Sequence, residues 1–228
     1  MSQAASISGQ GGAAHALGRQ LASPSGIAGS IVGVAMGLLN ARPTRLVIDA
    51  AEISADHHVL DAGCGGGQAL ALVAPRCAHA CGFDASPLMV EQARARNRHA
   101  IAAGRVYIQR GRFDDVPFPS GSFDRIIAAN VAYFWTDFGK VMAEFARLLR
   151  PGGRVAIYVT AAESMRNWRF AQTGTHRLFD RASLAAALAP HCGDAFHLDV
   201  DQAAVTRRIS GIIATLDRID ARAGPAGK

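Results

Sequence analysis

A carboxylate followed by three evenly spaced glycines is the most chemically informative stretch of the chain. Asp61 ends an apolar run, and Gly63, Gly65 and Gly67 follow it at alternate positions. Glycine has no Cβ, so the backbone of such a turn can adopt positive φ and let a ligand approach closely. A helix is predicted to resume at Ala69, and the free N–H groups at its start would suit a carboxylate or phosphate. We therefore predict a ligand-binding turn between a buried strand and a helix.

Two familiar glycine loops fit this stretch poorly. The P-loop ends in Gly-Lys-Ser/Thr, whereas Gly67 is followed by Gln68 and Ala69. The dinucleotide fingerprint Gly-x-Gly-x-x-Gly/Ala would place its last residue at Gln68. The remaining pattern, acidic-x-Gly-x-Gly-x-Gly, resembles the cofactor loop of class I methyltransferases. In that family the loop holds the methionine part of S-adenosylmethionine, and its acidic residue lies near the ammonium group.

A second acidic residue follows the next predicted strand. Asp84 comes 17 positions after Gly67 (84 − 67), close to the roughly 20-residue offset at which a carboxylate meets ribose hydroxyls. A helix-capping or surface aspartate is the alternative. The resemblance places Ala85 beside it and Met89 near the adenine, although a core methionine explains Met89 nearly as well.

The segment from Gly111 to Phe118 resembles the family's Gly-Asp-Ala-x-x-Leu-Pro-Phe motif. Arg112 stands where the family has an acidic residue that accepts from the adenine amino group, and an arginine cannot accept a hydrogen bond. Asp114 or a backbone carbonyl is left as the acceptor, while Phe113 offers its N–H and its ring.

The turn after the fourth predicted strand begins at Asn130 and Val131 and contains three aromatic residues. In the family this turn reaches both the cofactor and the substrate. The amino-methyltransferases of DNA and RNA carry Asn/Asp-Pro-Pro-Tyr/Phe here, so the absence of prolines argues against methylation of a base amino group. Tyr133 and Trp135 are candidates for a substrate pocket, because their polar ends need a partner. Core packing is the alternative for both, and is at least as good an explanation for Phe134.

These observations define the predicted site. Tyr133 and His176 are the candidate catalytic residues, and Tyr133, Trp135 and His176 the candidate substrate contacts; a surface histidine is the alternative for His176. We expect no metal, since Cys77-x-His79-x-Cys81 lacks a fourth ligand at a usual spacing. The predicted cofactor-binding residues are Asp61, Gly63, Cys64, Gly65, Gly67, Asp84, Ala85, Met89, Arg112, Phe113, Asn130 and Val131.

Alternating strands and helices must position these residues. Strands are predicted near 57–62, 79–84, 105–109, 123–129 and 152–159, and helices near 67–75, 86–102 and 137–149. Such alternation predicts a doubly wound α/β fold with a mostly parallel sheet and helices on both faces. The family resemblance implies seven strands in a Rossmann-like sheet, closed by an antiparallel C-terminal hairpin for which we expect strands near 194–200 and 205–215.

Composition predicts the domain organisation and the compartment. We expect a mobile tail over 1–24, N-terminal helices forming a lid over 25–54, and the S-adenosylmethionine-binding domain over 55–223. Within the lid, Gly29, Gly33 and Gly37 share one face of a helix predicted over 26–40. No secretory signal is apparent, and four scattered cysteines favour a reducing, cytoplasmic location.

The net charge of +6 raises the question of an anionic partner. The densest basic group comprises Arg94, Arg96, Arg98, Arg105, Arg110 and Arg112, and we interpret it as a solvated face. The sequence thus predicts a small-molecule methyltransferase using S-adenosylmethionine, with secondary metabolism as one setting. Alternatives are a lipid, quinone or RNA methyltransferase and a non-catalytic cofactor-binding protein. A homodimer and a peripheral membrane contact are both compatible with the sequence.

Overall fold

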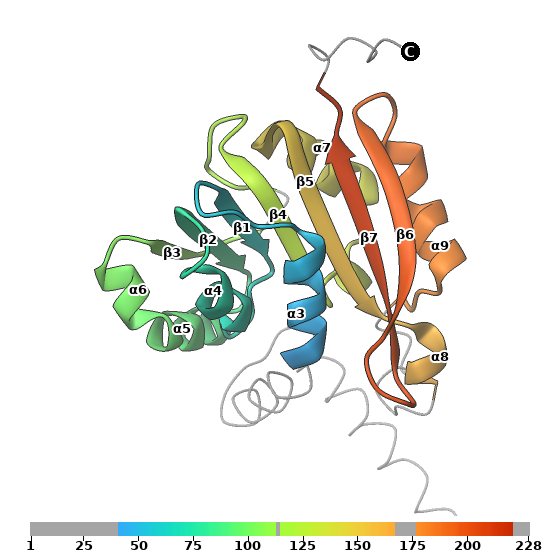
Figure 1. Cartoon of the computed structure of the whole chain (residues 1–228), viewed down its shortest axis with the longest axis horizontal. Helices are drawn as coiled ribbons and strands as arrows, with labels where there is room; N and C mark the ends of the chain where they lie inside the picture. Colours follow the sequence, from blue (N-terminus) through green and yellow to red (C-terminus); the bar gives the residue numbers. More distant parts are fainter. Residues whose placement is uncertain (1–40, 113–114, 167–176, 221–228) are drawn as a thin grey trace, which may run out of the picture.

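A seven-stranded sheet forms the centre of the protein, with strand order β3-β2-β1-β4-β5-β7-β6 (Figure 1). The computed structural model describes residues 41–112, 115–166 and 177–220. The predicted tail over 1–24, the predicted helix over 26–40, and the site candidates Phe113, Asp114 and His176 lie outside these ranges. The lid and the domain boundaries therefore stay predictions.

The strands have the predicted directions. Five neighbouring strands are parallel, while β7 pairs antiparallel with both β5 and β6. This confirms the mostly parallel sheet with an antiparallel C-terminal hairpin. The strands are β1 (His58–Ala62), β2 (His79–Asp84), β3 (Val106–Arg110), β4 (Phe123–Ala129), β5 (Leu149–Thr160), β6 (Phe196–Ala204) and β7 (Ser210–Arg218).

Helices cover both faces of the sheet, as predicted. Each face carries its own cluster of buried apolar side chains, which exclude water from both faces of the sheet. On one face lie α3 (Ala41–Ala50), α4 (Gln68–Val73) and α5 (Pro87–Arg96), followed by α6 (Arg98–Ala102). On the other lie α7 (Phe138–Leu148) and α9 (Arg181–Leu188); the short elements are η1 (Ala132–Phe134), α8 (Ala162–Met165) and η3 (Ala189–His191).

Three predicted boundaries were wrong for identifiable reasons. The helix predicted over 86–102 breaks at Asn97, whose side chain bonds to backbone carbonyls. The strand predicted near 152–159 already begins at Leu149, directly after α7 ends at Leu148, and its pairing with β4 has an irregularity. The hairpin strands begin and end later than predicted, because residues 205–209 form the turn.

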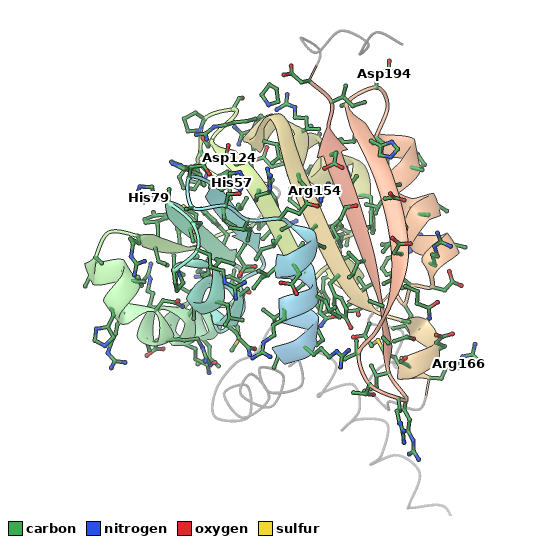
Figure 2. All side chains as sticks on the ribbon, in the orientation of Figure 1. His57, His79, Asp124, Arg154, Arg166 and Asp194 are labelled. Carbon is green, nitrogen blue, oxygen red and sulfur yellow. The ribbon has the colours of Figure 1, made fainter. Side chains whose placement is uncertain are left out.

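The end of helix α3 is attached to the sheet by Arg154 of β5. Arg154 donates to the carbonyl of Ala50 at 3.2 Å and pairs with the carboxylates of Glu52 and Asp217, both at 2.6 Å. These contacts hold the end of α3 over the amino ends of the strands, where Figure 2 shows Arg154. The start of α3, at Ala41, therefore lies towards the carboxyl ends of β1, β4 and β5 (Figure 1). We call the edge formed by these carboxyl ends the carboxyl edge.

The packing of the core can be tested where β7 pairs with β5. A Cβ on Gly211 would lie 2.2–2.5 Å from ring atoms and the hydroxyl of the fully buried Tyr158. We expect Gly211→Ala to lower the free energy of unfolding by about 1–3 kcal/mol, because the ring must shift within a close-packed core. Chemical denaturation measures the change.

The matched control is Gly66→Ala, whose added Cβ would meet its nearest atom only at 3.5 Å. Equal stability of the two variants would contradict this account of the β5–β7 contact.

Candidate functional site

The glycine turn joins the carboxyl end of β1 to α4 and has the backbone conformation that its sequence predicted. Gly63, Gly65 and Gly67 have φ of 84°, 49° and 73°, a region that other residues rarely adopt. A Cβ on Gly63 would lie 2.5 Å from a methyl group of Val131, so this glycine lets the turn pack against the end of β4. A Cβ on Gly65 would meet nothing within 4 Å. The turn is thus packed on one side and open at its middle glycine.

The turn is held from behind by the junction between α5 and α6. The buried side chain of Asn97 donates to the carbonyls of Gly67 at 3.0 Å and Ala93 at 2.8 Å. Arg96 donates from Nε to the carbonyl of Gly66 at 2.8 Å. These bonds fix the carbonyls on the rear of the turn and so preorganise it for a ligand.

Asp84 bonds to the same turn from the neighbouring strand. One carboxylate oxygen accepts from the N–H of Gly65 at 2.9 Å, and the other accepts from the N–H of Ser86 at 2.8 Å. The Ser86 side chain caps α5, because it accepts from the Met89 N–H at the start of that helix. Because a carboxylate has about four acceptor positions, Asp84 can hold this geometry and still accept from a ligand.

Asp61 is an acid buried behind the turn. Its side chain is 2 % exposed, and its Oδ2 has no hydrogen-bond partner among the described residues. Burial, assisted by the nearby charge of Asp84, raises the pKa of Asp61 to about 8. Burial, with smaller contributions from Asp61 and Asp84, also raises the pKa of the Cys64 thiol. Within the described residues, no positively charged side chain offsets the effect of burial on Asp61.

The end of β4 is braced against the end of β5. Asn130 has a φ of 57°, a left-handed conformation that asparagine tolerates better than most residues. Its Oδ1 accepts from the N–H of Thr160 at 3.1 Å and from the hydroxyl of Tyr133 at 2.9 Å. The Tyr133 hydroxyl in turn accepts from the Thr160 N–H at 2.5 Å. This network fixes Asn130 and Val131 opposite the glycine turn.

The structure places the aromatic substrate candidates in the core. Tyr133 is 8 % exposed and its hydroxyl is bonded internally; burial raises its pKa, so it is protonated at neutral pH. Trp135 is 5 % exposed and packs edge-on against Phe138 and Phe145. These positions favour the core-packing alternative for both residues. Their predicted substrate contacts, and a catalytic role for Tyr133, receive no support from this geometry.

The remaining cofactor candidates lie near Asp84. The N–H of Gly111 donates to the Asp84 carbonyl at 3.1 Å, which places Arg112 just beyond that strand end. Ala85 is exposed there, while Met89 is only 5 % exposed. The roles of Arg112, Ala85 and Met89 in adenine binding stay predictions.

The arginines predicted to form a solvated face also make hydrogen bonds to the backbone. Besides Arg96, three of them donate to backbone carbonyls: Arg94 to Ile108 at 2.8 Å, Arg105 to Ala74 at 3.1 Å and Arg110 to Ala85 at 3.3 Å. Their guanidinium groups therefore support the strand ends and loops of this half of the sheet. These arginines are also exposed, as the interpretation of a solvated face requires, so the bonds to carbonyls are an addition to it.

Hydrogen bonds and an ion pair form a structural network at the amino ends of the strands, opposite the carboxyl edge. Asp124 accepts from the His58 N–H at 2.8 Å and forms an ion pair with Arg150 at 2.7 Å. Figure 2 shows Asp124 with His57 and His79 at this edge, away from the glycine turn. Within the described ranges, no group of three or more His, Cys, Asp or Glu residues could hold a metal ion. All four cysteines have free thiols.

Sequence reasoning did not identify the residues that support the site. Asn97 and Thr160 bond directly to the glycine turn and to Asn130, respectively. An asparagine within a predicted helix is a signal that was available, because its side chain competes for backbone hydrogen bonds. Thr160 gave no comparable signal, since its contact depends on the pairing of β4 with β5.

A second test concerns the support of the turn. We expect Asn97→Ala to lower the free energy of unfolding by about 1–3 kcal/mol, because it removes two buried side-chain hydrogen bonds; both carbonyls keep a backbone donor. Arg96→Ala removes a bond at an exposed position, so its effect should be smaller. Urea denaturation of both variants measures the difference, and a larger loss for Arg96→Ala would contradict the assignment.

Comparison with known proteins agrees with this geometry. Residues 60–157 match the family model of a methyltransferase domain. Methyltransferase GfsG of Streptomyces halstedii is 38 % identical over 117 residues, which are 51 % of this chain and 42 % of that protein. Nocamycin O-methyltransferase of Saccharothrix syringae is 33 % identical over 137 residues, 58 % of this chain and 49 % of that protein. The chain thus spans less than half the length of these relatives.

The fold also has solved counterparts. The crystal structure of YcgJ from Bacillus subtilis superposes with a TM-score of 0.65 at 19 % identity, covering 78 % of this chain and 98 % of that one. At this identity the likeness concerns the fold alone. In the ranges that the structure describes, no helix combines the length and apolar character needed to cross a bilayer.

Proposed function

We propose that this chain, whose residues 60–157 form a class I methyltransferase domain, transfers a methyl group from S-adenosylmethionine to a small-molecule acceptor. The observation that supports this most directly is the buried carboxylate of Asp61, which has an unpartnered oxygen behind a turn of three positive-φ glycines. A carboxylate in this state is stabilised by a cation, and the ammonium group of the cofactor is one. The carboxylate of Asp84 lies on the same turn.

The residues present fit the cofactor. The space beside Gly65 leaves room for a ligand to approach the backbone, and Asp84 retains acceptor positions for the two ribose hydroxyls. Asn130 and Val131 face the turn from the end of β4, where they would border the amino-acid part. When bound, the cofactor supplies a methyl group that its sulfonium charge has already activated for in-line displacement.

The protein's task is then orientation and exclusion of water. The braces made by Asn97 and Thr160 hold the two sides of the site, so little reorganisation is needed when ligands bind. Tyr133 keeps its proton at neutral pH, because burial raises its pKa, and its hydroxyl positions Asn130. We therefore assign Tyr133 a positioning role and expect that the acceptor either needs no base or loses its proton to a group other than Tyr133.

Two observations favour a small acceptor. Nocamycin O-methyltransferase, which is named for a small molecule, is 33 % identical to this chain over 137 residues. The arginines that first suggested RNA are engaged with backbone carbonyls. We propose a setting in secondary metabolism on the same grounds.

The test is transfer of a labelled methyl group. The full chain is incubated with S-adenosylmethionine carrying a tritiated methyl group and with a panel of phenols, carboxylic acids, amines and a structured RNA. We expect label in one class of small molecule, with no label in RNA. Tight cofactor binding without transfer to any acceptor would instead support the non-catalytic alternative, and labelled RNA would contradict the proposed substrate class.

A further inference from the structure

A hollow of about 310 Å³ opens beside α8 and the turn between β6 and β7. Its lining includes Ser164 of α8, Ser210 at the start of β7, and Arg207 and Arg208 of the turn. Figure 1 shows this turn and α8 together at the carboxyl edge, and Figure 2 shows Arg166, which follows α8, at the same place. The volume is within the range of sites for small molecules.

The turn that carries the two arginines is well ordered. Val205 anchors it, since its side chain is only 5 % exposed and belongs to the core on the α3 face. The Thr206 hydroxyl accepts from the N–H groups of Arg208 at 3.2 Å and Ile209 at 3.1 Å. The N–H groups of Val205 and Thr206 both donate to the Ile209 carbonyl at 2.9 Å. The backbone thus presents Arg207 and Arg208 at the hollow without a flexible loop.

The two arginines form no ion pair within the described part of the chain. Arg207 and Arg208 are exposed, and no described carboxylate lies within 4.0 Å of either guanidinium, unlike Arg154, which has two carboxylate partners. Glu163 borders the hollow, but its Oε1 accepts from the Gln202 amide at 2.9 Å and the Ser210 hydroxyl at 2.8 Å. Two adjacent guanidinium groups with hydroxyls beside them suit a carboxylate or a phosphate.

The hollow lies close to the braced end of β4. The Ser210 carbonyl accepts from the N–H of Ala161 at 3.0 Å, and Ala161 follows Thr160. The N–H of Thr160 donates to Asn130. At most about 3.6 Å of chain per residue separates Thr160 from Ser164, so their Cα atoms are within about 14 Å. A small acceptor could therefore reach from the hollow to the region of Asn130.

From this proximity we infer that the methyl acceptor is an acidic small molecule whose carboxylate or phosphate group is bound by Arg207 and Arg208. The inference rests on the proposed function, because it names the class of acceptor for that site. It assigns the anchoring of the acceptor to the C-terminal hairpin and leaves the cofactor to the glycine turn and Asp84.

The first experiment uses anions of defined chemistry. Isothermal titration of the full chain with pyrophosphate and with succinate, at low ionic strength, reports phosphate and carboxylate binding separately. We expect at least one to bind, and the double variant Arg207→Gln/Arg208→Gln to weaken that binding tenfold or more. Glu163→Gln removes the neighbouring negative charge and should strengthen it.

The matched control is Arg76→Gln/Arg98→Gln, which removes the same charge from two exposed arginines near α4 and in α6. We expect it to change the affinity for the anion less than twofold. Equal weakening in both double variants would overturn the inference, because it would show only a general charge effect. Failure of both anions to bind the wild type would overturn it as well.

A membrane surface is the competing ligand for exposed arginines. Binding of wild-type protein to phosphatidylglycerol vesicles, without binding of either small anion, would assign the pair to lipid and overturn the inference. Titration of the wild type with S-adenosylhomocysteine distinguishes failure of this inference from failure of the proposed function. If the wild type binds the nucleoside but neither anion, only the acidic acceptor is refuted. Absence of nucleoside binding refutes the methyltransferase proposal itself.

Discussion

Replacement of Asp84 by alanine is expected to weaken the binding of S-adenosylhomocysteine by about 10- to 150-fold. This corresponds to the loss of about 1.5–3 kcal/mol for hydrogen bonds to a charged group. Two effects add in this variant. The ribose hydroxyls lose their proposed acceptor, and the N–H of Gly65 loses the carboxylate that holds the middle of the glycine turn. Isothermal titration calorimetry measures the affinity directly.

Two further variants test the origin of the effect. Asp194→Ala removes an exposed aspartate at the other edge of the sheet (Figure 2), and it should bind the nucleoside as the wild type does. Asp84→Asn keeps the shape and one acceptor oxygen, so we expect an intermediate loss. Wild-type affinity in Asp84→Ala would remove Asp84 from the cofactor site.

The affinity for S-adenosylhomocysteine is expected to rise with pH up to about pH 8. Burial raises the pKa of Asp61 to about 8, so the free protein holds its proton at neutral pH. Pairing with the ammonium group favours the charged form, so binding releases the proton. Below pH 8 the affinity should therefore increase by up to about tenfold per pH unit. Calorimetry in buffers of different ionisation enthalpy counts the released protons.

The ionisation of Asp61 should also make the free energy of unfolding of the ligand-free protein depend on pH. The pKa of Asp61 is raised above its ordinary value of 3.8, so between about pH 4 and pH 8 the folded state binds more protons than the unfolded state. The contribution of Asp61 to the free energy of unfolding is therefore present at low pH and is lost as the pH rises through this window.

Asp61→Asn should remove both pH dependences, because the amide does not ionise and cannot pair with the ammonium group. Its affinity for the nucleoside should be lower than that of the wild type and flat with pH. Its free energy of unfolding at pH 8 should be less reduced relative to pH 5 than in the wild type. A pH profile of binding unchanged from wild type would exclude Asp61 as the linked group.

The sequence predicted the parts of this structure that depend on local pattern. The acidic residue, three glycines and second acidic residue predicted two strand ends and the turn between them, and Asp84 does bond to Gly65. The helix predicted from residue 86 begins at Pro87, where Ser86 caps it. These features need no knowledge of distant contacts, because glycine, proline and helix-capping residues act on the backbone near them.

What escaped prediction depends on contacts between distant segments. Tyr133 and Trp135 have polar ends that suggested a substrate pocket, yet the Tyr133 hydroxyl finds its partners in Asn130 and Thr160. The hairpin turn has no glycine, proline or asparagine, and the Thr206 side chain shapes it instead. The position of its two arginines beside α8 depends on the pairing of β5 with β7, which the sequence pattern does not reveal.

The orientation of α3 has a practical consequence for reporter design. Arg154 ties the last turn of this helix to the amino ends of the strands, which leaves Ala41 facing the opposite way. The last strand, in contrast, finishes among the amino ends (Figure 1). A fluorescent protein joined directly to Ala41 would therefore report on ligand arrival by proximity, whereas a second fluorescent protein of another colour, attached after Asp220, would serve as the distant reference in a two-colour sensor.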